Sequence, residues 1–285
     1  VMPNHPGTGF GTRGHPPNLG PTAATPVWTV EYELDFASFG DHNFASTATK
    51  ALSSATASGT RSATWTAYNS GAANKFALSS AGLEIDPKGG ESEGSPHLWA
   101  GVQTLPYLAA PLTSMMAGLS EDDTIAFQLY MDSSPVPSAA FDAYGLALWN
   151  GVAPSNSEYL CLRYYLGADG NRRAEGFLEQ ESYDSMIQAT SQTFFEVVLY
   201  PGNGAVSNIG VFDTEFPDPL TSGTFQTYSS LSPILGPGGG NDQAIPSWKI
   251  PKATASFMIH TQRNNSATTL LTTAYKMRVL RRRKT

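Results

Sequence analysis

Residues 158–166 read Glu-Tyr-Leu-Cys-Leu-Arg-Tyr-Tyr-Leu, and this stretch shows the architecture of the chain most clearly. Successive side chains of a strand point to opposite faces, so the alternation of Leu160, Leu162, Tyr164 and Leu166 predicts a strand with one buried face. The next residues, Gly167-Ala168-Asp169-Gly170-Asn171, tolerate the positive φ of a tight hairpin turn. We therefore expect a returning strand over residues 172–181.

The same logic extends to residue 212. Phe195, Val197 and Leu199 alternate with their neighbours, Pro201-Gly202-Asn203-Gly204 predicts a turn, and residues 205–212 follow as another strand. The stretch from 158 to 212 is thus typical of antiparallel sheet built hairpin by hairpin.

Alternation elsewhere in the chain predicts further strands at 27–36, 76–78, 83–85, 97–102, 125–131, 144–150, 257–261 and 275–280. In the first of them, Trp28, Val30, Tyr32, Leu34 and Phe36 are expected to share the buried face. The opposite face, with Glu31, Glu33 and Asp35, is expected to be solvated. The Ser/Thr/Ala-rich residues 46–64 are expected to form a surface excursion, and one helical turn is expected near residues 114–118.

Composition supports the same fold class. Only 14% of the 285 residues are charged, while 27 glycines and 20 prolines fit many short strands joined by turns. Strands without alternating helices predict an all-β, antiparallel two-sheet jelly-roll sandwich, with the last strand beside the first. The single cysteine, Cys161, excludes a disulfide framework and is expected to be a small buried residue.

The two ends differ from this body. Residues 1–26 hold six prolines and five glycines and predict an extended arm, so the sandwich is expected to cover residues 27–285. The last ten residues hold six bases and no acid, which leaves 11 bases against 24 acids in the first 275 residues. We expect both ends to meet partner surfaces, with these candidate assembly contacts: Phe10, Arg13, Arg281, Arg282 and Arg283. An acidic body argues against sequence-specific nucleic-acid binding.

No apolar run is long enough to span a membrane, and no signal peptide is recognised, so folding in a cytoplasm is expected. The Pro/Gly/Ser-rich residues 216–251 exceed an ordinary hairpin loop and are expected to be functional or bound to a partner.

The body resembles a concanavalin A-like lectin/glucanase sandwich, also called laminin-G-like. The resemblance rests on four stretches: the first strand Trp28-Thr29-Val30-Glu31-Tyr32-Glu33-Leu34-Asp35-Phe36, the strand beginning Asp123-Thr124-Ile125-Ala126-Phe127, the hairpin 195–212, and the closing Ala274-Tyr275-Lys276-Met277-Arg278-Val279-Leu280. Such sandwiches occur as sugar-binding modules, as glycosidases and as virion proteins of tailed phages. The Gly/Pro arm and the Ser/Thr/Ala-rich composition are most similar to the last group.

The match between this sequence and the catalytic motif of the glucanase branch is weak. The glucanase branch of that family pairs carboxylates in a pattern close to Glu-x-Asp-x-x-Glu, but here Glu33-Leu34-Asp35-Phe36-Ala37-Ser38 ends in serine. A second acidic cluster, residues 179–184, fits an exposed strand end equally well. We therefore predict no catalytic residue and no resident cofactor. The acidic residues 213–218 could supply oxygen ligands to Ca²⁺, although a Pro-containing surface loop explains them too.

Sugar binding would require an exposed aromatic platform, for which Tyr183, Tyr228 and Trp248 are the candidates. The leading hypothesis is a non-enzymatic structural protein of a virion, such as a capsid decoration, a head fibre or a tail adhesin component. Its expected partners are other virion proteins, copies of itself and a host surface glycan. A carbohydrate-binding lectin and a glycoside hydrolase are the alternatives.

Overall fold

The computed structural model describes residues 28–44, 48–57, 59–68, 73–87, 107–140, 142–150, 159–167, 169–178, 181–187, 194–199, 206–212, 234–235, 242–243, 254–263 and 269–283. Over these ranges, no helix has the length and apolar character needed to cross a membrane.

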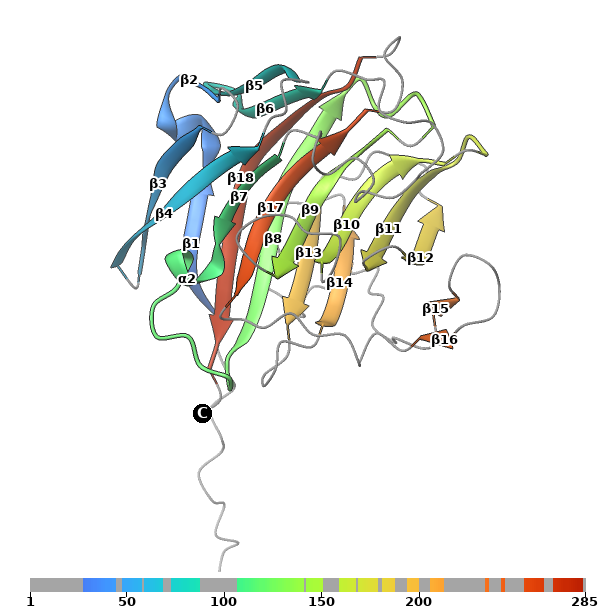
Figure 1. The fold of residues 1–285 in the computed structure, drawn as a ribbon. Coiled ribbons are helices and arrows are strands. Elements are labelled where there is room, and N and C mark those ends of the chain that lie inside the picture. Colours follow the sequence, from blue (N-terminus) through green and yellow to red (C-terminus); the bar gives the residue numbers. More distant parts are fainter. Residues whose placement is uncertain are drawn as a thin grey trace, which may run out of the picture.

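Nearly all regular structure in these ranges is β-strand (Figure 1). The strands are β1 (Thr29–Asp35), β2 (His42–Asn43), β3 (Thr49–Thr56), β4 (Gly59–Tyr68), β5 (Ala73–Ser79), β6 (Gly82–Pro87), β7 (Tyr107–Pro111), β8 (Thr124–Ser134), β9 (Ala143–Asn150), β10 (Tyr159–Leu166), β11 (Arg172–Leu178), β12 (Glu181–Ile187), β13 (Phe194–Leu199), β14 (Val206–Phe212), β15 (Ile234–Leu235), β16 (Asp242–Gln243), β17 (Ala255–Gln262) and β18 (Leu271–Arg282). Two single-turn helices, η1 (Phe36–Phe39) and α2 (Leu112–Met115), complete the set.

Two large antiparallel sheets face each other across one core. Sheet A has the order β14-β13-β8-β18-β6-β5-β2, and β1 also pairs with β18. Sheet B has the order β12-β11-β10-β9-β17-β7-β4-β3. This architecture confirms the predicted all-β, antiparallel two-sheet sandwich.

Strand β18 is the central element of sheet A, as expected for a last strand lying beside the first. One of its edges pairs with β8 along eleven residues, from Leu271 opposite Ser134 to Arg282 opposite Thr124. The other edge is shared, because Thr272–Ala274 pair with β6 whereas Lys276–Arg281 pair with β1. Both the predicted hairpin β10–β11 and the predicted hairpin β13–β14 are present.

Residues 46–64 correct one expectation, because they are not a surface excursion. They supply β3 and the first half of β4, which pair with each other from Thr49 opposite Thr66 to Thr56 opposite Gly59. The pattern was weak because most residues on both faces are small; among the side chains described, Leu52, Ala63, Trp65 and Ala67 enter the core from these strands, and two of these four are alanines. The expected helical turn lies slightly earlier, at α2, and the strand predicted at 97–102 falls outside the described residues.

Aromatic side chains organise the core at the end where β1, β3 and β4 meet. Trp65 is fully buried and lies edge-on to Phe36 and Phe257, with ring centroids 6.3 and 6.0 Å away. Its indole Nε1 donates to the Tyr32 hydroxyl at 3.2 Å, which in turn donates to the Leu52 carbonyl at 2.7 Å. Since a buried N–H or O–H without a partner is costly, this relay lets polar aromatic groups occupy the core.

A β-bulge in β1 corrects a second expectation. Val30 pairs with Leu280 and Tyr32 pairs with Val279, so Glu31 is an extra residue. An inserted residue reverses the alternation. Tyr32, Leu34 and Phe36 therefore enter the main core, whereas Trp28 and Val30 pack on the other face of sheet A against Ala126, Val198 and Leu280.

Candidate functional site

The chain enters the sandwich and leaves it at one end of sheet A. Thr29, the first residue of β1, pairs with Arg281, the next-to-last residue of β18. Figure 1 shows β18 running down to this end, where the C-terminus lies. We call this end the terminal pole and define it by Trp28, Glu31, Arg61, Asp123, Arg281, Arg282 and Arg283.

Arg282 and Arg283 form the basic rim of the terminal pole. The guanidinium of Arg282 lies over the Trp28 ring, with its carbon 5.0 Å from the ring centroid, which is a cation–π geometry. The Arg283 side chain is 64% exposed, and its Nε lies 3.9 Å from Asp123 Oδ1. These two predicted contact residues thus lie beside Trp28 and Asp123.

Arg281, the third candidate assembly contact in this part of the chain, differs from Arg282 and Arg283 because it is buried. Its side chain is only 6% exposed. Its Nη1 donates to the carbonyls of Ala117 and Gly118 at 2.9 and 3.1 Å, and its Nη2 donates to Glu31 Oε1 at 2.5 Å. The strand continues through this residue to Arg282, so Arg281 ties β18 to β1 and to the loop before β8.

The three acids of β1 were expected on one solvated face, and only part of that expectation holds. Glu31 is 2% exposed and also lies 3.7 Å from the Arg61 guanidinium, so it belongs to a buried ion cluster. Glu33 pairs with Arg278 at the surface, where both side chains are partly exposed. Asp35 is exposed and its Oδ1 accepts from the Ala37 N–H at 3.1 Å, capping η1.

A second polar row crosses the outer face of sheet A and was not predicted. Glu196 in β13, Gln128 in β8, Arg278 in β18 and Glu33 in β1 are successive partners in the ladder. Gln128 Nε2 donates to Glu196 Oε2 at 2.5 Å, and both residues are fully buried. Burial raises the pKa of Glu196 to about 7, against the lowering effect of the Gln128 hydrogen bond.

This row does not form a glycosidase pair. Glu196 and Glu33 are three strand spacings apart, or about 14 Å at about 4.8 Å per spacing. Paired carboxylates that cleave glycosidic bonds are about 5–9.5 Å apart. A carboxylate within the otherwise apolar run Phe194-Phe195-Glu196-Val197-Val198-Leu199 is the signal that could have drawn attention to this position.

Most of the predicted contact residues lie outside the residues that the structure describes. Phe10, Arg13, Tyr228, Trp248 and the acidic residues 213–218 lie outside the described residues. Tyr183 and Cys161 lie in β12 and β10, but their side chains are not described. In the ranges that are described, no three His, Cys, Asp or Glu side chains are grouped so that they could hold a metal ion.

Comparison with known proteins gives likeness of fold only. No protein-family model matches the chain, and no curated protein matches it. Among solved structures, it is similar to the alginate lyase AlgAT5 from polysaccharide lyase family 7, with a TM-score of 0.34, 10% identity, and coverage of 81% of this chain and 82% of that one.

It is also similar to Rv0315 of Mycobacterium tuberculosis, described as an immunostimulatory antigen and pseudo β-1,3-glucanase, with a TM-score of 0.36, 8% identity, and coverage of 71% and 76%. A carbohydrate esterase from the Shiga toxin-encoding bacteriophage phi24B gives a TM-score of 0.32, 8% identity, and coverage of 89% and 99%. At these scores the likenesses transfer no activity, so function has to be argued from the residues of this chain.

Proposed function

We propose that the protein is a non-enzymatic structural component of a virus particle, attached to the particle through the terminal pole and displaying the sandwich outward. A capsid decoration, a head fibre and a tail adhesin component all fit this description. In each case its partners are other virion proteins and further copies of this chain.

The observation that carries the proposal is the pairing of Thr29, in the first strand, with Arg281, in the last one, which brings Trp28 beside Arg282. From its composition we infer that the Gly/Pro-rich segment 1–26 is an extended arm, because it has almost nothing to bury. It joins the body beside Trp28, where Arg282 and Arg283 supply positive charge to a protein whose net charge is −7. An arm and a basic rim at one pole suit attachment to a single acidic partner surface and leave the rest of the sandwich accessible.

The acidic residues of β1 fit a non-enzymatic role. Glu31 is neutralised by Arg281, Glu33 pairs with Arg278, and Asp35 caps a helix. Both carboxylates of the motif that resembled a glucanase site, Glu33 and Asp35, therefore have a structural use.

Attachment can be tested with particles that lack this protein. Purified tagged chain would be added to them, the particles separated on a density gradient, and the bound protein quantified by mass spectrometry. We expect the full chain to bind, and either deletion of residues 1–26 or the double variant Arg282→Ser/Arg283→Ser to reduce the bound amount at least tenfold.

The matched control is Lys50→Ser/Lys75→Ser, which also removes two positive charges but from β3 and β5. Absence of the protein from purified particles, or binding that neither pole variant weakens, would refute the attachment. A reducing-sugar assay on polysaccharides, with Glu33→Gln and Glu181→Gln, tests the enzymatic alternative. Hydrolysis abolished by either substitution would overturn the non-enzymatic assignment.

A further inference from the structure

Strand β3 is an open edge of sheet B. It pairs with β4 along all eight of its residues without a register shift, and it contains neither proline nor glycine. Over the described residues, no strand pairs with its other side, and Figure 1 shows β3 at the border of the fold. Such an edge can template pairing with another chain, and natural proteins usually blunt it with proline, bulges or charges.

The hydrogen-bonding pattern shows which backbone groups of β3 face outward. The Ala67 N–H donates to the Ala48 carbonyl at 2.8 Å, and antiparallel partners alternate between hydrogen-bonded and non-hydrogen-bonded pairs. The even-numbered residues of β3 therefore bond to β4. The backbone N–H and C=O groups of the odd-numbered residues point away from β4, and these residues are all exposed: Thr49, Ala51, Ser53 and Ala55.

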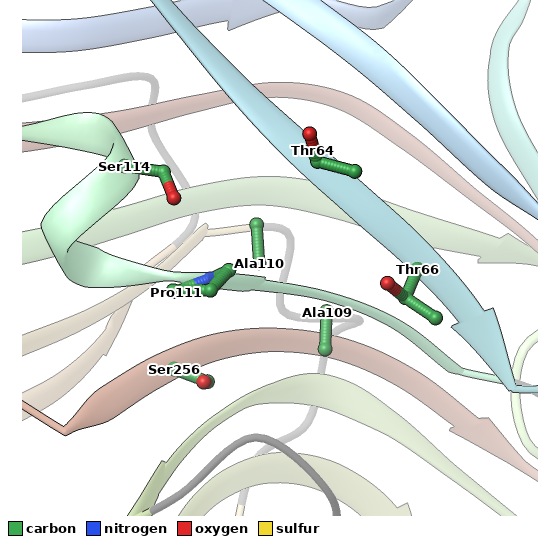
Figure 2. A pocket seen from close by; sticks show the side chains of 7 residues that line it. All are labelled: Thr64, Thr66, Ala109, Ala110, Pro111, Ser114 and Ser256. Atoms are coloured by element: carbon green, nitrogen blue, oxygen red, sulfur yellow. The ribbon is translucent and has the colours of Figure 1, made fainter.

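The outer surface beside this edge is low. The residues of β4 that pair with the four outward residues of β3 are also short: Thr60, Ser62, Thr64 and Thr66. Figure 2 shows Thr64 and Thr66 beside Ala109 of β7 and Ser256 of β17, around a hollow of about 180 Å³. Within β3 and β4, no bulky side chain rises on this face to obstruct a neighbouring chain.

We propose that β3 pairs antiparallel with β3 of a second copy, so that the two B sheets form one continuous sheet. An edge that meets its own copy makes an isologous contact about a twofold axis. One register pairs all four outward residues, with Ala51 opposite the partner's Ser53 and Thr49 opposite the partner's Ala55. A shift of two residues in either direction leaves one outward residue without a partner.

This register is compatible with the charges and the hydrogen bonds of the strand. Lys50, the one charged residue of β3, lies opposite the partner's Ser54 rather than opposite a like charge. Four pairs that exchange two bonds each give about eight backbone hydrogen bonds, within the range of about 10 ± 5 for a typical interface.

The seam is short, because eight residues at about 3.4 Å each extend over about 27 Å. Interfaces of small area are weak, so we expect a dissociation constant of about 1–100 µM. The twofold axis reverses the strand direction, so the terminal poles of the two copies face opposite ways. The pairing therefore does not rest on attachment to a particle, and it can be tested on the isolated chain.

Sedimentation velocity of the full chain from about 1 to 200 µM tests the pairing. We expect the mass to rise from that of one chain towards twice that mass. Ala51→Lys/Ser53→Lys places like charges directly opposite each other across the seam and should weaken the dimer at least tenfold, as should Ala51→Glu/Ser53→Glu. A one-to-one mixture of the two variants should recover the dimer to within threefold of the parent, because each lysine then faces a glutamate.

Ser62→Lys/Thr64→Lys is the matched control, since it adds the same charges to the same face one strand further from the seam. It should weaken the dimer less than threefold. A chain that stays monomeric up to 200 µM, or a dimer that Ala51→Lys/Ser53→Lys leaves unchanged, would overturn the proposal. So would a mixture that shows no recovery, or a control that weakens the dimer as much as the seam variants. Recovery on mixing excludes misfolding as the cause of the loss.

Discussion

The buried ion cluster of the terminal pole gives the sharpest test of how this sandwich is held together. Arg281→Met removes the guanidinium while keeping an apolar stem of similar length. It deprives Glu31 of its partner at 2.5 Å and Asp123 of one at 3.6 Å, and these carboxylate side chains are only 3% and 1% exposed. The Ala117 and Gly118 carbonyls lose their donor as well.

Leaving buried charge uncompensated typically costs about 3–5 kcal/mol of unfolding free energy. Arg61, 3.7 Å from Glu31, and Arg283, 3.9 Å from Asp123, remain after the substitution. They lie further away than Arg281 Nη2 lies from Glu31, so they offset only part of the loss. We therefore expect a decrease of about 3 kcal/mol for Arg281→Met.

Arg278→Met is the matched control. It removes the same group from the same strand, again from an ion pair at 2.5 Å, but there the side chains are 28% and 41% exposed. Exposed pairs contribute about 0–1 kcal/mol. Equilibrium urea unfolding of both variants, followed by tryptophan fluorescence, measures the difference. Equal decreases in unfolding free energy would show that burial does not determine how much the Glu31–Arg281 pair contributes to stability.

Adding Glu31→Gln to Arg281→Met should recover about 1 kcal/mol of unfolding free energy, since it removes one buried charge that has lost its partner.

Two further substitutions test other features of the fold. Burial raises the pKa of Glu196 from 4.5 to about 7 in the folded state, so its contribution to stability is fully present below pH 4.5 and is lost as the pH rises through 7. Glu196→Gln should therefore be more stable than the parent at pH 8, by at most about 3 kcal/mol, and should have no advantage at pH 4.5. Urea unfolding at both pH values measures this difference. An unchanged difference between the two pH values would contradict the buried acid. Gly145→Ala should lower the unfolding free energy by more than about 3 kcal/mol, because the added Cβ would lie 2.1 Å from the Leu162 carbonyl oxygen. Gly59→Ala is the control, since Gly59 also has a positive φ but its added Cβ would have nothing within 4 Å. It should cost only about 1 kcal/mol, and thermal unfolding measures both variants. Similar losses at the two glycines would mean that backbone conformation, rather than close strand approach, sets the cost.

The sequence was sufficient to predict strands whose two faces differ strongly. The runs that became β8, β10, β13 and β18 alternate large apolar residues with others, and the pairing of the last strand with the first followed from closing the core. It was insufficient for β3 and β4, because Leu52 and Trp65 are the large apolar residues of their inner face and most of the other residues on both faces are Ser, Thr or Ala.

The terminal pole shows a different limit. The bulge at Glu31 reverses the face of Trp28 and Val30, but the run from Trp28 to Phe36 alternates without any local sign of an extra residue. Burial of Glu31 depends on Arg281, which lies 250 positions further along the chain. A single sequence contains both residues but does not indicate that they meet.

The same contacts bear on how the protein could withstand load at its proposed attachment. If only the C-terminal end were held, tension would act on β18 alone and would shear it from β8 and β1. With attachment through both β1 and β18 at the terminal pole, the load would act on the two strands together. The hydrogen bonds between these two strands would then bear little shear force. The Arg281–Glu31 pair joins those strands at the residues nearest the pole, and its contacts with Ala117 and Gly118 pass part of the load to the loop before β8. A buried ion pair at this position thus stabilises the one region of the sandwich where attachment would concentrate force.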